Sequence, residues 1–249
     1  MPRPLLLLLL SLAVALLLGC ASTDETPKRR TVDDVYQEAM ESYESGDWND
    51  ALAKFDVIKL QYPASQWADD AQFYVAEINY RRGEFVLAAF NYSVVRRSFP
   101  TSERAKVAAY QIGVCYEEMA LPSDRDQEYT KKAIGAYTEF QNVYPQDSLA
   151  LVALEKIRTL RDQLAERYLL VAEHYQKTRS RKAAIVYYDL LLEEYPDAKY
   201  YEQALVSKLR MQYEMAMIAE ARETIAVYRR TVTEPTMKAE VDEMERNLP

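Results

Sequence analysis

The sequence predicts an all-α fold, a solenoid of about five helix-turn-helix repeats, from its proline spacing and its internal periodicity. An aromatic residue followed by proline recurs at four similar intervals, as Tyr62-Pro63, Phe99-Pro100, Tyr144-Pro145 and Tyr195-Pro196. With an offset of 37 residues, Ala39 aligns with Ala76, and the same offset aligns two glycines. Two helices of this length cannot bury their apolar faces alone, so successive pairs must stack on one another.

Four copies of the repeat are complete, and the fifth is degenerate. Each copy has small residues and one large residue where its two helices are expected to cross. These residues are Ala39, Ala51 and Phe55 in copy 32–65; Ala76, Ala88 and Tyr92 in copy 69–102; Gly113, Ala133 and Tyr137 in copy 106–148; Ala172, Ala184 and Tyr188 in copy 149–198; and Ala221 and Ile225 in copy 202–235. Small residues let two helices cross closely, and decay is expected of a terminal repeat. The pattern resembles tetratricopeptide (TPR) repeats. It therefore favours a TPR-type helical solenoid over residues 32–249 rather than an irregular helical bundle.

Two departures from the regular period predict local structure. The interval from Gly113 to Ala133 in repeat three is eight residues longer than the corresponding interval from Ala39 to Ala51 in repeat one. The extra residues form a polar run over 121–128 that contains a proline. Such a run is typical of a loop between helices. Repeat four contains 14 extra residues after Pro145, with neither proline nor glycine among them. They amount to roughly four helical turns, so we expect one long helix from about Ser148 to Gln176.

Residues 1–19 predict a lipoprotein signal peptide. Arg3 precedes an uncharged apolar run of 14 residues, which is shorter than a helix needs to span a bilayer. The run ends in Leu17-Leu18-Gly19-Cys20, which resembles the bacterial lipobox. That resemblance implies that Cys20 becomes the mature N-terminus and carries diacylglycerol and an N-acyl chain. An ordinary signal sequence cut elsewhere is the alternative.

Residues 20–31 predict a lipidated tether. Between Ala21 and Thr31 no apolar residue is larger than alanine, and 11 extended residues reach about 36 Å. More than one acyl chain is needed for a stable anchor, because a single chain binds a membrane reversibly. Alanine, not aspartate, follows Cys20. By resemblance to sorted lipoproteins this implies attachment to the periplasmic face of the outer membrane.

Composition and motifs argue against nucleic-acid binding and against catalysis. The chain has 39 acidic and 31 basic residues, which is not the charge balance of a nucleic-acid-binding protein. It contains one histidine, His174, and no phosphate-binding loop, metal-spaced cluster or nucleophile elbow. We therefore expect no enzyme activity, no metal and no cofactor besides the lipid on Cys20. A hydrolase would need an acid–base cluster that only the fold could assemble. Cys115 is expected to be a small core residue.

Recurring positions of the first helix of each repeat line the concave wall of a TPR solenoid and are the candidate partner-binding residues. In repeats one to three they are Tyr36, Met40, Tyr43, Phe73, Glu77, Tyr80, Arg81 and Tyr110. In repeats four and five they are Leu169, Glu173, Val206, Arg210 and Tyr213. Aromatic residues with polar neighbours suit an extended peptide, and the second, mixed set suits a folded domain. The alternative is that the aromatic residues pack between helices as ordinary core.

Taken together, these features resemble the BamD (ComL/YfiO) family of outer-membrane lipoproteins. They are the lipobox, the tether, the five repeats, the long helix and the inserted loop with Asp124-Arg125-Asp126-Gln127. The resemblance implies a non-enzymatic subunit of the β-barrel assembly machine. Its first three repeats would receive C-terminal segments of unfolded outer-membrane proteins. Its last two would dock on the periplasmic part of a BamA-like barrel protein, beside other lipoproteins of the machine. The alternative is another TPR lipoprotein scaffold, such as a pilus-secretin pilotin or a peptidoglycan-synthase regulator.

Overall fold

The computed structural model describes residues 30–249, which form eleven α-helices and no β-strand. The helices are α2 (Val32–Ser45), α3 (Trp48–Gln61), α4 (Ala68–Arg81), α5 (Phe85–Ser98), α6 (Glu103–Glu118), α7 (Glu128–Val143), α8 (Ser148–Lys177), α9 (Arg181–Glu194), α10 (Tyr201–Glu214), α11 (Ile218–Thr231) and α12 (Lys238–Arg246). None of these helices has both the length and the apolar content that crossing a membrane requires. The expected signal peptide and Cys20 lie outside the described residues.

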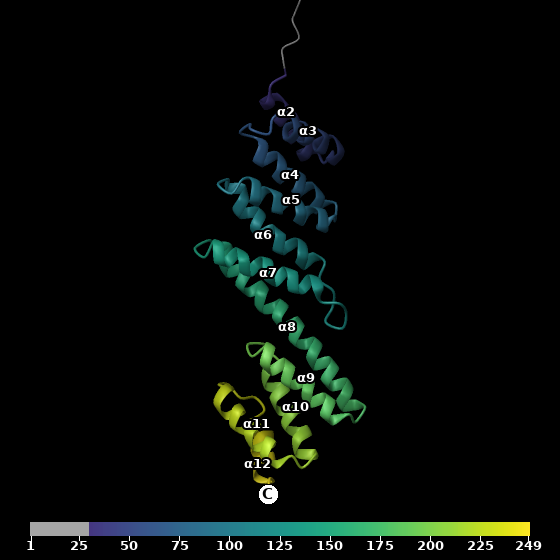
Figure 1. Cartoon of the computed structure of the whole chain (residues 1–249), viewed down its shortest axis with the longest axis vertical. Coiled ribbons are helices and arrows are strands. Elements are labelled where there is room, and N and C mark those ends of the chain that lie inside the picture. The colour runs from purple at the N-terminus through teal and green to yellow at the C-terminus, as the bar shows by residue number, and fades with distance from the viewer. Residues whose placement is uncertain (1–29) are drawn as a thin grey trace, which may run out of the picture.

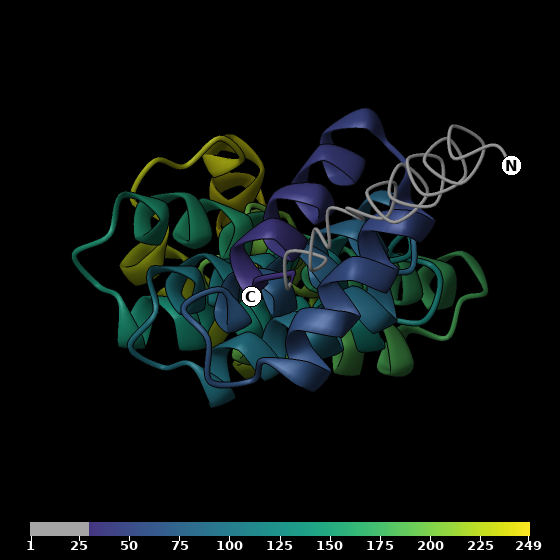
Figure 2. The same ribbon diagram turned by 90° about the horizontal axis from the view of Figure 1, so that it is seen from above.

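The helices form an elongated stack of antiparallel pairs (Figure 1). Helix contacts join elements that are neighbours or next neighbours in the chain, and a view along the long axis shows the repeats arranged one behind another (Figure 2). Five pairs, from α2–α3 to α10–α11, correspond to the five expected repeats. The predicted all-α, TPR-type solenoid is therefore confirmed.

Within each of the first four repeats, a small residue on the first helix faces a large, buried residue on the second. Ala39, Ala76 and Ala172 have no exposed surface, and neither do the facing rings Phe55, Tyr92, Tyr137 and Tyr188. In repeat three the small residue is Gly113, and a Cβ atom added there would lie 2.5 Å from Cε1 of Tyr137. In repeat five the residue on the first helix is larger, Leu209, and the residue on the second helix is smaller than a ring, Ile225; the two pack in one cluster.

The inserted loop over 121–128 is fixed to the long helix α8. Gln127 organises the loop by donating hydrogen bonds to the carbonyl oxygens of Leu121, Pro122 and Arg125 at 2.8–3.2 Å. From α8, Gln163 donates to Gln127 Oε1 at 3.0 Å, and Arg167 donates to the carbonyl of Arg125 at 2.6 Å. The 30-residue helix α8, expected to end near Gln176, spans Ser148–Lys177. The loop therefore braces α8 where it passes from repeat three to repeat four.

The chain ends in a helix, α12, that the repeat pattern did not predict. Val241 is fully buried and Met244 is 8% exposed, and both pack with residues of α10 and α11. Their spacing of three residues is that of an amphipathic helix, but the segment lies beyond the last recognisable repeat. α12 thus covers the end of the stack and extends the solenoid by a half-repeat.

The crossing in repeat three generates a stability prediction. Gly113→Ala should lower the free energy of unfolding by about 1–3 kcal/mol, because the new methyl group overpacks against the Tyr137 ring. Gly135→Ala, at an exposed position of α7 where an added Cβ meets nothing within 4 Å, should raise it by about 0.5–1 kcal/mol through helix propensity. Urea unfolding measures both. A Gly113→Ala protein as stable as Gly135→Ala would show that this crossing is not tight.

Candidate partner-binding surfaces

The wall of the first repeat is built from packed aromatic rings. Tyr36 is half-buried and stacks on Trp67, with ring centroids 4.0 Å apart and planes 9° from parallel. Its ring also meets that of Phe55 in a T-shaped arrangement, at a centroid distance of 6.4 Å. Burial raises the pKa of Tyr36, so its hydroxyl stays protonated. Tyr36 therefore offers a partner a partly covered ring and a neutral hydroxyl rather than a free ring. Met40 is half-buried against the same cluster.

An exposed arginine lies over two half-buried aromatic rings where the first two repeats meet. The guanidinium carbon of Arg81 is 5.2 Å from the ring centroid of Tyr43 and 5.6 Å from that of Trp48. Cations at this distance are attracted to the face of an aromatic ring. Glu77 lies on the same helix and accepts a hydrogen bond from the hydroxyl of Tyr92. Arg81, Tyr43 and Glu77 thus form a surface, the Arg81 site, that combines a cation, rings and a carboxylate.

Phe73 was expected on the concave wall, but it belongs to the core. It is 5% exposed, and its ring lies 5.8 Å from that of Tyr74 and 5.6 Å from that of Tyr92. The guanidinium carbon of Arg104 covers it at 4.8 Å. Since so little of Phe73 reaches solvent, a partner cannot use it as an anchor without rearrangement.

Two tyrosine hydroxyls of repeats two and three donate hydrogen bonds to glutamates of α6. Tyr80 donates to Glu118 at 3.2 Å, and the buried Tyr137 donates to Glu117 at 2.7 Å. Burial and the neighbouring Glu118 raise the pKa of Tyr80 to about 12. Tyr110 is half-buried with its ring against Tyr137, 5.4 Å away. Tyr80 and Tyr110 are therefore partly accessible, but both are held by neighbours.

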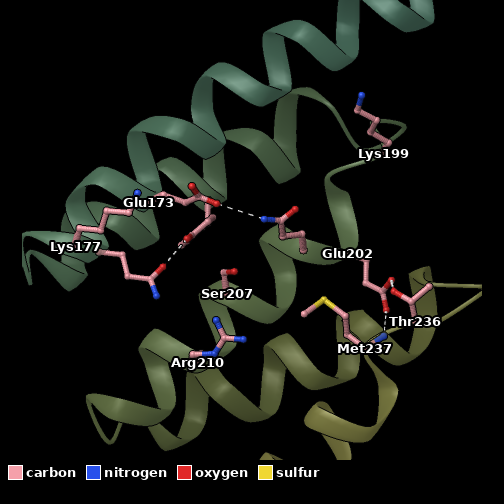
Figure 3. A pocket seen from close by; sticks show the side chains of 11 residues that line it. Glu173, Lys177, Lys199, Glu202, Ser207, Arg210, Thr236 and Met237 are labelled. Carbon is pink, nitrogen blue, oxygen red and sulfur yellow. Dashed lines mark hydrogen bonds between the residues drawn. The ribbon is translucent and has the colours of Figure 1, made fainter. Parts of the chain in front are cut away.

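A pocket of about 850 Å³ opens between α8, α10 and the turn before α12 (Figure 3). Glu173 and Lys177 enter it from α8, Arg210 from α10, and Met237 from the last turn. Its volume is within the range of ligand-binding pockets, but its lining is mostly polar and carries both signs of charge. Such a lining fits a polar protein surface better than an apolar small molecule.

The structure brings Glu173 and Arg210 together in this pocket and separates them from the other residues expected beside them. Leu169 is 5% exposed and Val206 is fully buried, so both are core residues and not contact residues. Tyr213 is exposed but does not line the pocket. Arg210 donates from Nε to Glu240 of α12 at 3.0 Å. It therefore also fixes the terminal helix.

Glu202 is a pocket residue that sequence reasoning missed. Its carboxylate accepts hydrogen bonds from the hydroxyls of Tyr228 and Thr236 at 2.8 and 2.6 Å and from the amide of Met237 at 2.8 Å. Burial alone would raise the pKa of Glu202, but these hydrogen bonds outweigh it and lower the pKa. The partners stand 26 to 35 residues away in the sequence. The sequence could have indicated these hydrogen bonds to Glu202 only if the α12 segment had been predicted.

The described residues give no sign of a reactive centre. Cys115 is buried, as expected of a core residue, and burial raises the pKa of its thiol to about 12. A thiol in this state is a poor nucleophile. His174 is exposed. Within residues 30–249, no group of three or more His, Cys, Asp or Glu side chains is arranged to hold a metal ion.

The Glu202 contacts predict a pH-dependent stability. Replacing Glu202 with Gln should lower the free energy of unfolding at pH 7 by about 1–3 kcal/mol, because hydrogen bonds to a charged group are lost. The folded pKa is depressed, so the carboxylate's contribution is present above the unfolded value of about 4.3 and is lost as pH falls through the folded pKa. The difference between the two proteins should therefore shrink below about pH 4. Urea unfolding at pH 7 and pH 3.5 measures it, with Glu220→Gln, an exposed glutamate, as the control.

Comparison with known proteins gives consistent matches along the chain. Residues 28–227 match the family YfiO, described as outer membrane lipoprotein. The chain is 25% identical over 229 residues to the outer membrane protein assembly factor BamD of Caulobacter vibrioides, covering 90% of this chain and 75% of the relative. It is 25% identical over 218 residues to BamD of Vibrio cholerae, covering 83% and 90%. Among solved structures, the P58(IPK) TPR domain aligns with 87% of this chain and 52% of its own, at 12% identity and a TM-score of 0.44.

Proposed function

Because the chain belongs to the YfiO family of outer-membrane lipoproteins, we propose that it is a non-enzymatic scaffold for the assembly of outer-membrane proteins. The observation that carries the proposal is the extent of the match, which covers residues 28–227 and so almost the whole stack. The relatives are named outer membrane protein assembly factors. A stack of helical pairs with a long exposed wall is suited to holding other proteins.

The first three repeats are proposed to receive C-terminal segments of unfolded outer-membrane proteins. The Arg81 site supports this role, because its guanidinium and rings are accessible and lie at the junction of two repeats. An aromatic side chain of a peptide would extend the ring cluster around Tyr43. A peptide carboxylate would pair with Arg81. With Phe73 in the core, Arg81 and Tyr43 become the proposed anchors.

The last two repeats are proposed to dock on the periplasmic part of a BamA-like barrel protein. The pocket between α8 and α10 supports this role, because it is large, polar and open to solvent. Lys177 is exposed and pairs with no carboxylate among the described residues, so its charge is available to a partner. Other lipoproteins of the machine would add to the same assembly.

The first test concerns the membrane anchor. Cys20→Ala should abolish acylation and weaken attachment to the outer membrane, because only the proposed contact with the barrel protein would then remain for a chain whose described helices include none able to span a bilayer. Membrane fractionation with a palmitate label measures the effect. A Cys20→Ala protein that still incorporates the palmitate label would refute lipidation at this residue.

The second test separates the two proposed surfaces. Arg81→Ala should weaken binding of a peptide that ends in the C-terminal aromatic motif of an outer-membrane barrel by about thirtyfold, the effect of losing a hot spot of about 2 kcal/mol. It should leave co-purification with the barrel protein unchanged. Lys177→Glu should do the reverse. Fluorescence anisotropy follows the peptide, and pull-down from detergent-solubilised membranes follows the barrel protein.

Matched controls are available on neighbouring residues. Arg82→Ala removes an exposed arginine that is bonded to Asn49, and Lys182→Glu reverses an exposed lysine that lies outside the pocket; both should be silent. If Arg81→Ala and Lys177→Glu each damage both interactions, the two-surface proposal is wrong. If the wild-type protein captures mainly a secretin or a penicillin-binding protein, the alternative scaffold function is correct.

A further inference from the structure

A second hollow lies on the other side of α10, between α9 and α11, and has a volume of about 550 Å³. It is a groove because three consecutive helices supply one face each. At 100° per residue, Tyr201, Leu205 and Lys208 of α10 point about 180° away from Gln203, Ser207 and Arg210, which line the pocket of Figure 3. The two hollows are therefore separate, and each could be occupied while the other is filled.

The groove has an apolar floor. Ile185 and Leu192 of α9, Leu205 of α10 and Val227 of α11 all line it. Leu205 is 2% exposed, and the other three are half-buried. Ile185 and Leu192 are seven residues apart, so they lie on the same helix face. Covering this floor would remove apolar surface from water, which favours association.

The rim of the groove is acidic. Asp189, Glu193, Glu220 and Glu223 line it together with a single cation, Lys208. Lys208 pairs with Asp189 at 2.6 Å. In the described part of the chain, the other three carboxylates form no ion pair, and all three are exposed. The rim thus holds three uncompensated negative charges around an apolar floor.

We propose that this groove docks a basic amphipathic helical segment of another protein. From Tyr201 to Gln212 the lining of the groove extends over twelve residues of α10, which is eleven steps of the helix or about 16 Å, three helical turns. A helix that places apolar residues at i, i+3, i+4 and i+7 fits such a groove. Lysine or arginine on both flanks of that helix would face the three free carboxylates. The chain's own Lys28-Arg29-Arg30 is basic, but the tether around it has no large apolar residue; the occupant is a partner.

Two labelled peptides of 14 residues test the proposal with the full-length protein in detergent. Both have leucine on one helical face; the first has lysine on its flanks, and the second has glutamate there. The lysine peptide should bind at least about tenfold more tightly, because three charge pairs form at the rim. Fluorescence anisotropy at low and high salt measures this preference, which salt should reduce. The assay does not depend on the barrel protein, so its outcome is independent of the proposed assembly function.

Charge-reversed variants locate the binding. The double variant Glu220→Lys, Glu223→Lys should abolish the preference for the lysine peptide. The control Glu234→Lys, Glu243→Lys changes the net charge equally at exposed positions outside the groove and should retain the preference. Equal binding of both peptides, or equal effects of the two double variants, would overturn the proposal. So would a chain that self-associates through this groove, seen by sedimentation as a dimer that only Glu220→Lys, Glu223→Lys dissociates.

Discussion

The close crossing of two helices at one small residue, in each of the first four repeats, is the constraint on which the structure depends. A side chain of zero or one carbon at Gly113 or Ala76 lets the second helix place a tyrosine ring directly against the first helix's backbone. That ring fills the interior of its repeat. Because protein interiors are close-packed, the two facing side chains of a repeat compensate for each other in size. Repeat five has Leu209 instead of a small residue on its first helix, and Ile225 replaces the ring on its second.

The two irregular features of the chain act on each other. The insertion in repeat three supplies a loop, and the extension of repeat four supplies the additional turns of α8 on which that loop rests. Without the loop, Arg167 would lose its carbonyl partner, and Gln163 would keep only its bond to Thr130 of α7 at 3.3 Å. The loop carbonyls of Leu121 and Arg125 accept hydrogen bonds both from Gln127 and from these α8 side chains. This contact adds to the packing of α8 on α7 at the point where the C-terminal repeats leave the N-terminal ones, between the two proposed partner surfaces.

The sequence was sufficient for the repeats, the core rings and the long helix, because each follows from periodicity along the chain. It was not sufficient to predict how deeply individual side chains are buried. By their positions within the repeat, Phe73, Leu169 and Val206 were expected on the concave wall, yet neighbouring helices cover them. Glu202 and α12 depend on contacts between residues about 30 positions apart that no repeat position specifies. The residues of the Arg81 site were among the expected wall positions, but the contact of its guanidinium with two rings joins three helices. The groove between α9 and α11 also arises from three helices at once, so spacing within a single helix does not reveal it.

The turns between paired helices have unequal backbone strain. Gly46 and Gly83 adopt positive φ angles of 82° and 74°, and the corresponding positions in repeats four and five are Arg179 at 61° and Ala216 at 54°. This conformation costs a residue with a Cβ roughly 1–2 kcal/mol. In a stack whose stability is a sum of repeat and interface terms, the turns of the C-terminal repeats therefore contribute less to stability than those of the first two repeats. A ligand that binds only their folded form would stabilise them by mass action, so complex formation would also act as quality control, leaving unassembled copies open to proteolysis at this end first.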